Sequence, residues 1–136
     1  MLFSKKKIYQ KRFKGKLKKN SIFKKGNKII YGKYAIKVLE ETRLNSFQIE
    51  AAKKVINKKI KKIGFLWVRV FPIIPITSKP NENRMGKGKG SVSFFVARVK
   101  QGQILFEISG IPFKTAKKIF ALSAKKLPIK TKFIYK

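Results

Sequence analysis

This chain of 136 residues carries 36 lysines and arginines against five acidic residues, a formal net charge of +31, so most of its cations cannot be paired internally. Such a charge favours a polyanionic partner, with nucleic acid as the first candidate and an anionic membrane surface as the second. The sequence contains no Cys, His or Asp, which excludes disulfides, thiolate metal sites and histidine-based acid–base catalysis.

The apolar content predicts a folded domain rather than a disordered polycation. Hydrophobic residues make up 43% of the chain and include 12 Phe, which disordered chains lack. We expect a basic RNA-binding arm over residues 1–28, with a solvated tail as the alternative, and a single domain over residues 29–136. No apolar run approaches the roughly 18 residues of a membrane span. We therefore expect no span, and we expect no secretory signal because no apolar segment follows the lysines at residues 5–7.

Residues 28–40 predict an extended segment, because β-branched and aromatic side chains dominate it. A helix is predicted to begin at Asn45 or Ser46, with Gln48 and Glu50 in its first turn. Apolar residues then recur at three- and four-residue steps until Gly64, namely Ile49, Ala52, Ile56, Ile60 and Ile63. The helix should bury this face and turn its lysines toward solvent.

Alternation predicts a strand over residues 65–71, with Leu66 on one face and Trp67 and Arg69 on the other. A short strand over 73–77 precedes a long loop over 78–91. Residues 92–99 and 103–108 predict a hairpin around Gly102.

A second helix is predicted from Pro112, which suits a first helical position, to Pro128, which stops it. Residues 129–135 alternate and predict a last strand. This order of elements predicts an α+β fold, with two helices packed on a mixed, mostly antiparallel sheet, a basic N-terminal arm and a long Gly-rich loop.

The loop over residues 78–91 holds the strongest functional signal. Seven consecutive residues in it combine three glycines and three cations, Arg84-Met85-Gly86-Lys87-Gly88-Lys89-Gly90. Glycine lets a backbone approach a ligand closely, and the cations favour phosphate. Neither nucleotide-binding pattern fits, because Gly90 stands where a P-loop needs Ser or Thr, and Ser91 stands where a dinucleotide loop needs its third glycine. The structural alternative, a flexible hairpin tip, leaves the cations unexplained.

Three functions are consistent with these residues. An RNA-binding structural protein is the first, and a general nucleic-acid-binding or chromatin-like protein, which would also bind duplex DNA, is the second. The third is an enzyme that grips a phosphorylated substrate with the loop. It would lose turnover on replacement of Glu82 with Gln, but the missing His, Cys and Asp argue against it.

Several segments, in order along nearly the whole chain, resemble the bacterial-type large-subunit ribosomal protein sixteen family, which bacteria and organelles share. The matching segments are Gly32-Lys33-Tyr34-Ala35, Gln48-Ile49-Glu50-Ala51-Ala52, Trp67-Val68-Arg69-Val70-Phe71-Pro72, the stretch from Pro75 to Gly90, Val96-Ala97, Gly102-x-Ile104-Leu105-x-Glu107, and Leu127-Pro128-Ile129-Lys130-Thr131-x-Phe133-Ile134. Each segment alone is weak evidence, but the set at this spacing is highly specific.

The resemblance implies a structural constituent of the large ribosomal subunit, without enzymatic activity or a cofactor. It implies binding to large-subunit rRNA near the aminoacyl-tRNA site, with support of subunit assembly and of tRNA accommodation. The implied partners are this rRNA, tRNA at the aminoacyl site and neighbouring ribosomal proteins. The implied RNA contacts are Arg84, Met85, Gly86, Gly88, Lys89 and Gly90 in the loop, and Lys5, Lys6, Lys7 and Arg12 in the arm. We further expect contacts from Lys14, Lys16, Arg69 and Lys87.

The chain departs from the family at a few positions. Lys87 stands where many members have a small polar residue, Phe94-Phe95 replaces a common Tyr-Trp pair, and Gln101 replaces a common Pro. Only five of the 36 cations are Arg, and heavy use of Lys, Ile, Phe and Asn indicates an A+T-rich genome. We therefore expect an organellar ribosome, first in the mitochondrial matrix, with the plastid stroma or the bacterial cytoplasm as alternatives.

Overall fold

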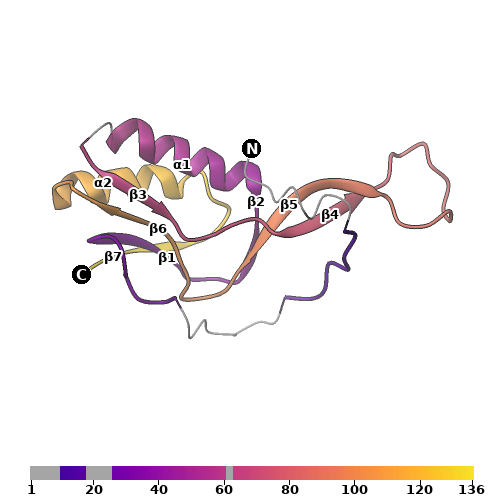
Figure 1. The fold of residues 1–136 in the computed structure, drawn as a ribbon, viewed down its shortest axis with the longest axis horizontal. Helices are drawn as coiled ribbons and strands as arrows, with labels where there is room; N and C mark the ends of the chain where they lie inside the picture. Colours follow the sequence, from indigo (N-terminus) through magenta and orange to yellow (C-terminus); the bar gives the residue numbers. More distant parts are fainter. Residues whose placement is uncertain (1–9, 18–25, 61–62) are drawn as a thin grey trace.

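The computed structural model of the chain describes residues 10–17, 26–60 and 63–136 (Figure 1). Two helices and seven strands in these residues confirm the α+β class. The elements, in chain order, are β1 (Tyr34–Val38), β2 (Thr42–Asn45), α1 (Ser46–Ile60), β3 (Phe65–Val68), β4 (Ile74–Ser78), β5 (Ser91–Val99), β6 (Ile104–Ser109), α2 (Phe113–Ala124) and β7 (Thr131–Tyr135). None of the helices in the described ranges is long and apolar enough to cross a membrane.

The strands form two antiparallel sheets, so the prediction of one mixed sheet was wrong in that detail. The larger sheet has the order β3-β6-β1-β7, and the smaller has the order β2-β5-β4. Strands β5 and β6, which we predicted to be a hairpin, lie in different sheets. The Gly102 N–H donates to the carbonyl of Val38 at 2.8 Å, and the Val38 N–H donates to Gln103 at 2.9 Å. These bonds direct the chain after Gly102 to β1 instead of back along β5.

Helix α1 begins with a reciprocal cap. The side-chain oxygen of Asn45 accepts from the Phe47 N–H at 3.3 Å, and the side-chain oxygen of Gln48 accepts from the Asn45 N–H at 3.0 Å. Glu50 lies beyond the first turn, which contains no acidic residue, so that part of the prediction was wrong. Ile63 was also misplaced, because the helix ends at Ile60 and the Ile63 side chain is exposed.

Both helices cover one face of the four-stranded sheet (Figure 1). The face that α2 buries consists of Ala116, Ile119, Phe120 and Ser123, whereas Phe113 at its start is 43% exposed. The core also includes the residues that β1, β6 and α1 turn toward it, such as Ile36, Phe106, Ile108, Ile49, Ala52 and Ile56. The two helices therefore cover one face of the larger sheet and not the other.

Residues 28–33, which we call the strap, lie over the buried side chain of Glu107 on β6. We predicted an extended segment over residues 28–40, and the strand β1 within it begins at Tyr34. The strap is fastened by Glu107 of β6, whose side chain is completely buried. Its carboxylate accepts backbone N–H groups from Tyr31 at 2.7 Å, Gly32 at 2.9 Å and Ile30 at 3.2 Å.

The Glu107 carboxylate also forms an ion pair with the Arg69 guanidinium, which follows β3. Burial raises the pKa of Glu107, but the Gly32 N–H, the Arg69 guanidinium and the Tyr31 N–H together outweigh it, and the net pKa lies below its ordinary value. The carboxylate is therefore held charged at neutral pH. One buried anion thus ties the strap, β3 and β6 together.

Candidate nucleic-acid interface

The loop between β4 and β5 projects beyond the rest of the molecule at one end (Figure 1). Strands β4 and β5 pair up to Ser78 and Ser91, and residues 79–89 between them are all exposed. A Cβ on Gly90 would lie 2.3 Å from the Ser78 carbonyl oxygen, so only glycine lets the strands approach this closely at the base of the loop. The loop surrounds an open hollow of about 760 Å³.

The tip of the loop has an unusual backbone. Gly86, Lys87 and Gly88 have φ angles of 94°, 55° and 79°, so three consecutive residues are left-handed. The two glycines adopt this conformation without steric cost, whereas Lys87 is strained by about 1–2 kcal/mol. The Lys79 ammonium donates to the Gly86 carbonyl and braces the turn. Lys87 in this turn and Arg84 just before it are both exposed.

The arm lies against this loop. The Lys11 ammonium donates to the Lys89 carbonyl at 2.8 Å, and the Lys89 ammonium donates in return to the Arg12 carbonyl. The same Lys89 nitrogen lies 4.6 Å from the centre of the exposed Phe13 ring. Residues more than 70 positions apart in the sequence therefore form a single surface, which we call the arm–loop end and define as residues 10–17 and 79–90.

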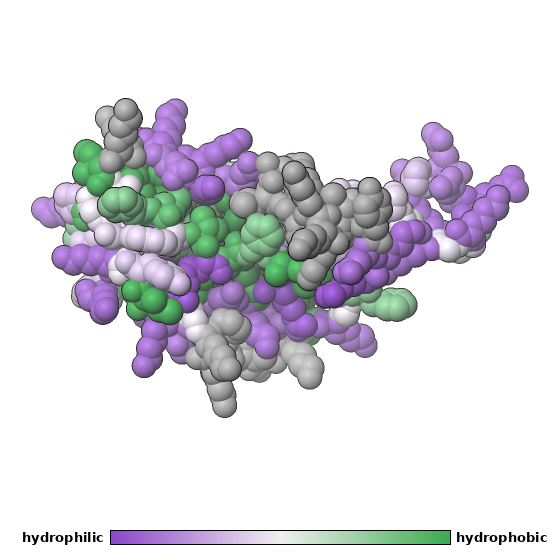
Figure 2. Space-filling view, in the orientation of Figure 1, coloured by the Kyte–Doolittle hydropathy of each residue, from purple (hydrophilic) through white to green (hydrophobic). Residues whose placement is uncertain are grey.

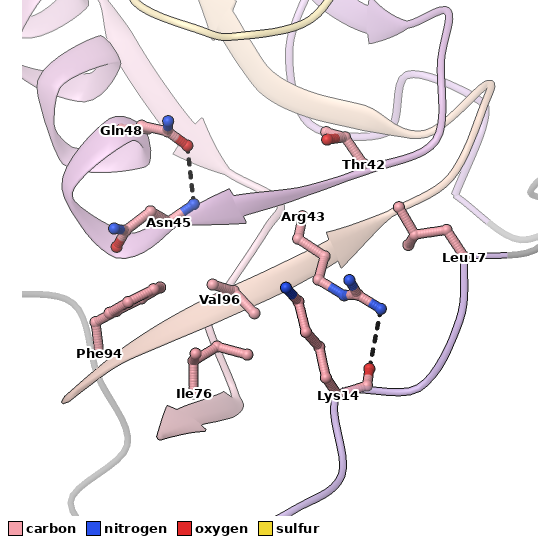
Figure 3. A pocket seen from close by; sticks show the side chains of 9 residues that line it. All are labelled: Lys14, Leu17, Thr42, Arg43, Asn45, Gln48, Ile76, Phe94 and Val96. Carbon is pink, nitrogen blue, oxygen red and sulfur yellow. Dashed lines mark hydrogen bonds between the residues drawn. The ribbon is translucent and has the colours of Figure 1, made fainter. Parts of the chain in front are cut away.

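Arg43 on β2 fastens the arm to the smaller sheet. Its guanidinium donates to the carbonyls of Lys14 at 2.9 Å and Gly15 at 2.7 Å. A groove of about 380 Å³ lies between the arm and the sheet (Figure 3). Its lining combines arm residues with apolar and polar side chains of β2, β4, β5 and α1, namely Lys14, Leu17, Thr42, Arg43, Asn45, Gln48, Ile76, Phe94 and Val96.

The predicted RNA-binding residues fall into three groups. Lys5, Lys6 and Lys7 lie outside the described residues. The structure brings together most of the others at the arm–loop end, namely Arg12, Lys14, Lys16, Arg84, Met85, Gly86, Lys87, Gly88, Lys89 and Gly90. Arg69 alone among the described candidates belongs elsewhere, because its guanidinium is paired with buried Glu107 and donates to the Lys28 carbonyl at 3.2 Å.

Sequence reasoning missed two residues that organise these surfaces. Glu107 had a signal, since it is a lone acid in an otherwise apolar strand and such a residue needs buried partners. For Arg43 there was no such signal, because nothing in the local sequence indicates that residues 14 and 15 return to β2. Both act through contacts between distant parts of the chain.

The sequence was compared with known proteins. Residues 4–134 match the family model described as ribosomal protein L16p/L10e. Among similar curated proteins, each named "Large ribosomal subunit protein uL16", that of Erythrobacter litoralis is 48% identical over 98% of this chain and 92% of its own length. Those of Bartonella bacilliformis and Azorhizobium caulinodans are 47% and 45% identical, each over 98% of this chain and 96% of the relative.

These relatives are bacterial, which fits the bacterial alternative and gives no specific support to the mitochondrial expectation. The match extends over nearly the whole chain and includes both the arm from residue 4 and the projecting loop. The chain therefore belongs to the ribosomal protein L16p/L10e family, that of the large ribosomal subunit protein uL16, and is a structural ribosomal protein rather than an enzyme.

Proposed function

We propose that the arm–loop end binds large-subunit rRNA beside the aminoacyl-tRNA site, and that the chain thereby supports subunit assembly and tRNA accommodation. The observation that carries this proposal is the reciprocal contact of Lys89 with Lys11 and Arg12, which joins the arm and the loop. Family resemblance supports the location at the aminoacyl site. Neighbouring ribosomal proteins and tRNA at that site are the other proposed partners.

The electrostatics of the arm–loop end suit phosphate. The hydrogen bonds of the Lys11 and Lys89 ammonium groups go to backbone carbonyls, which leave the positive charge unneutralised. Figure 2 shows hydrophilic side chains fanned out along the projecting loop. Lysine–phosphate contacts of this kind position a protein without reading sequence, so the shape of the RNA should decide where the chain binds.

The loop also offers apolar contacts to RNA. Met85 is completely exposed at the tip, and the Phe13 ring is 93% exposed beside Lys89. Unstacked bases of RNA stack on exposed aromatic side chains such as Phe13. The position of Met85 and Phe13 within a cationic surface explains why the chain leaves them uncovered.

Replacement of Arg84 with Ala tests the proposed function. Arg84 is exposed, so the purified variant should keep the circular dichroism spectrum and the unfolding midpoint of the wild-type chain. In cells that depend on the variant, large subunits should mature slowly, or tRNA accommodation should be slower on the finished ribosome. The matched control is Lys54→Ala on α1, which removes one exposed cation far along the sequence from the loop. Normal maturation together with normal accommodation in the Arg84 variant would contradict the proposal, as would loss of its fold.

A further inference from the structure

A second surface with the character of a binding site lies on the larger sheet, away from the arm–loop end. Phe65 and Trp67 alternate along β3 and share one face, and Tyr31 of the strap stacks on Trp67 with ring centres 6.2 Å apart and an angle of 19°. The Phe65 and Trp67 ring centres are 6.1 Å apart. We call Tyr31, Phe65 and Trp67 the aromatic platform. Figure 2 shows hydrophobic side chains among hydrophilic ones over the body of the molecule, away from the projecting loop.

Two of the three rings of the platform are open to solvent, and the third, Trp67, is half-buried between them. Phe65 is 67% exposed and Tyr31 is 60% exposed, and the neighbouring Ile30 is 59% exposed. Strand β3 is also an edge strand of its sheet, and no other strand of the described residues pairs with its outer side. The core therefore gains little from these aromatic side chains. Exposed apolar surface of this kind marks an interaction site.

The platform is held in place before any partner arrives. The Tyr31 N–H donates to buried Glu107 at 2.7 Å, and the Arg69 guanidinium lies 5.6 Å from the centre of the Tyr31 ring. Arg69 is itself paired with Glu107. The buried carboxylate of Glu107 therefore fixes both the strap and the guanidinium that lies beside the Tyr31 ring. A preorganised surface loses little conformational entropy when it binds.

The charges around the platform select the class of partner. Lys28 and Lys33 are exposed on the strap itself, and the nearest carboxylate, Glu107, is buried and neutralised by Arg69. The remaining acids lie on other elements, with Glu40 beside Lys130, Glu41 beside Arg98, Glu50 on α1 and Glu82 in the loop. Aromatic rings with cations beside them fit a partner that carries both flat bases and negatively charged phosphates.

We infer that the aromatic platform binds unpaired bases of RNA by stacking, with Lys28 and Lys33 against the adjoining phosphates. Stacking on an aromatic side chain tolerates every base, and it requires bases that are not already stacked in a duplex. This contact is separate from the arm–loop end. With both surfaces occupied, the chain bridges two RNA segments at opposite ends of its fold. A protein strand added to the free edge of β3 is the competing occupant.

Trp67 provides a direct readout, because it is the only tryptophan in the chain. The full chain is titrated with a single-stranded RNA decamer and, separately, with an RNA duplex of equal length, while the fluorescence of Trp67 is recorded. The single strand should quench Trp67, and the duplex should quench it far less. The variants Tyr31→Leu and Phe65→Leu should reduce the quenching and weaken binding of the single strand about tenfold, as expected for the loss of one stacked base.

The matched control is Phe47→Leu, which changes another exposed phenylalanine, 51% exposed on α1, and should bind like the wild-type chain. Circular dichroism of each variant confirms that it is folded. If the wild-type chain binds the single strand without quenching of Trp67, or if the platform variants bind as tightly as the control, the platform is not an RNA site, while the proposal for the arm–loop end stands.

Replacement of both Arg84 and Lys89 should weaken binding of the single strand but leave the quenching of Trp67 at saturation unchanged. Unweakened binding by that variant counts against the arm–loop end alone.

A second measurement separates RNA from protein as the occupant in the assembled particle. A photoreactive phenylalanine analogue is placed at position 65, and large subunits that contain it are irradiated. Crosslinks to rRNA support the inference. Crosslinks to a neighbouring protein overturn it and assign the free edge of β3 to that protein instead.

Discussion

Replacement of Glu107 with Ala is expected to destabilise the chain by about 3–5 kcal/mol, the usual cost of removing one partner of a buried ion pair. The variant leaves the backbone N–H groups of Tyr31 and Gly32 and the Arg69 guanidinium without their acceptor. A small domain has a total stability of about 5–15 kcal/mol, so a loss of this size is a large part of it. Urea unfolding followed by Trp67 fluorescence measures the change, because Trp67 pairs with Glu107 across the sheet.

The control is Glu40→Ala, which also removes a carboxylate from an ion pair. Glu40 is half exposed and lies 3.6 Å from Lys130 at the surface, so its loss should cost less than about 1 kcal/mol. If the Glu107 variant unfolds at the same urea concentration as the Glu40 variant, the buried carboxylate does not hold the strap in the way described above.

The contribution of Glu107 should also depend on pH. Its pKa is lowered in the folded chain, so its charge stabilises the fold fully at pH values above the unfolded-state pKa of about 4.3. This stabilisation is lost as the pH falls through the lower pKa of the folded state. The difference in stability between the wild-type chain and Glu107→Gln should therefore stay constant near neutral pH and shrink below about pH 4. A stability difference between the two chains that grows as the pH falls would contradict a lowered pKa of Glu107.

Local patterns predicted most of the helices and strands. The three- and four-residue spacing of Ile49, Ala52 and Ile56 places α1, because a helix face is set by neighbours a few residues apart. The same applies to α2 and to the alternation in β3, β5 and β6. Boundaries shifted where tertiary contacts take over, as at Tyr34, where the strap ends and β1 begins.

The arrangement of the strands could not be predicted from local patterns. Strands β5 and β6 follow each other closely and alternate as a hairpin does, yet Gly102 bonds to Val38 and sends β6 to another sheet. The strap depends on Glu107, some 75 residues away, and the arm depends on Arg43 and Lys89. Such contacts depend on the folded topology, and a single sequence contains no direct record of them.

The sequence alone predicted which loop residues belong to the candidate site, but it did not predict that the arm lies against them. The loop residues Arg84 to Gly90 are recognisable from their glycines and cations alone. Only the structure shows that Lys11, Arg12 and Phe13 lie against Lys89. Arg69 illustrates the opposite case, since its charge suggested a phosphate contact and the structure pairs it with a buried carboxylate.

The second large effect is expected for RNA binding by a variant in which Arg84, Lys87 and Lys89 are all replaced with Gln. Each lost contact between a cation and a phosphate costs about 1 kcal/mol, so the triple variant should bind structured RNA roughly a hundredfold more weakly at moderate salt. Its fold should survive, because the loop is exposed and Lys89 contributes surface hydrogen bonds only. The control replaces Lys53, Lys54 and Lys58 of α1 with Gln, which removes the same net charge from a helix.

The dependence of RNA affinity on salt tests the central claim, that the arm–loop end is the phosphate-binding surface, most directly. If the wild-type chain neutralises about ten phosphates, log K falls against log[salt] with a slope of roughly −7 to −9, and the loss of three contacts leaves a slope of roughly −5 to −6. The account predicts this shallower slope for the triple loop variant and a slope near the wild-type value for the α1 control. Equal slopes for the two variants would contradict it, because the phosphate contacts would then be spread over the whole charged surface.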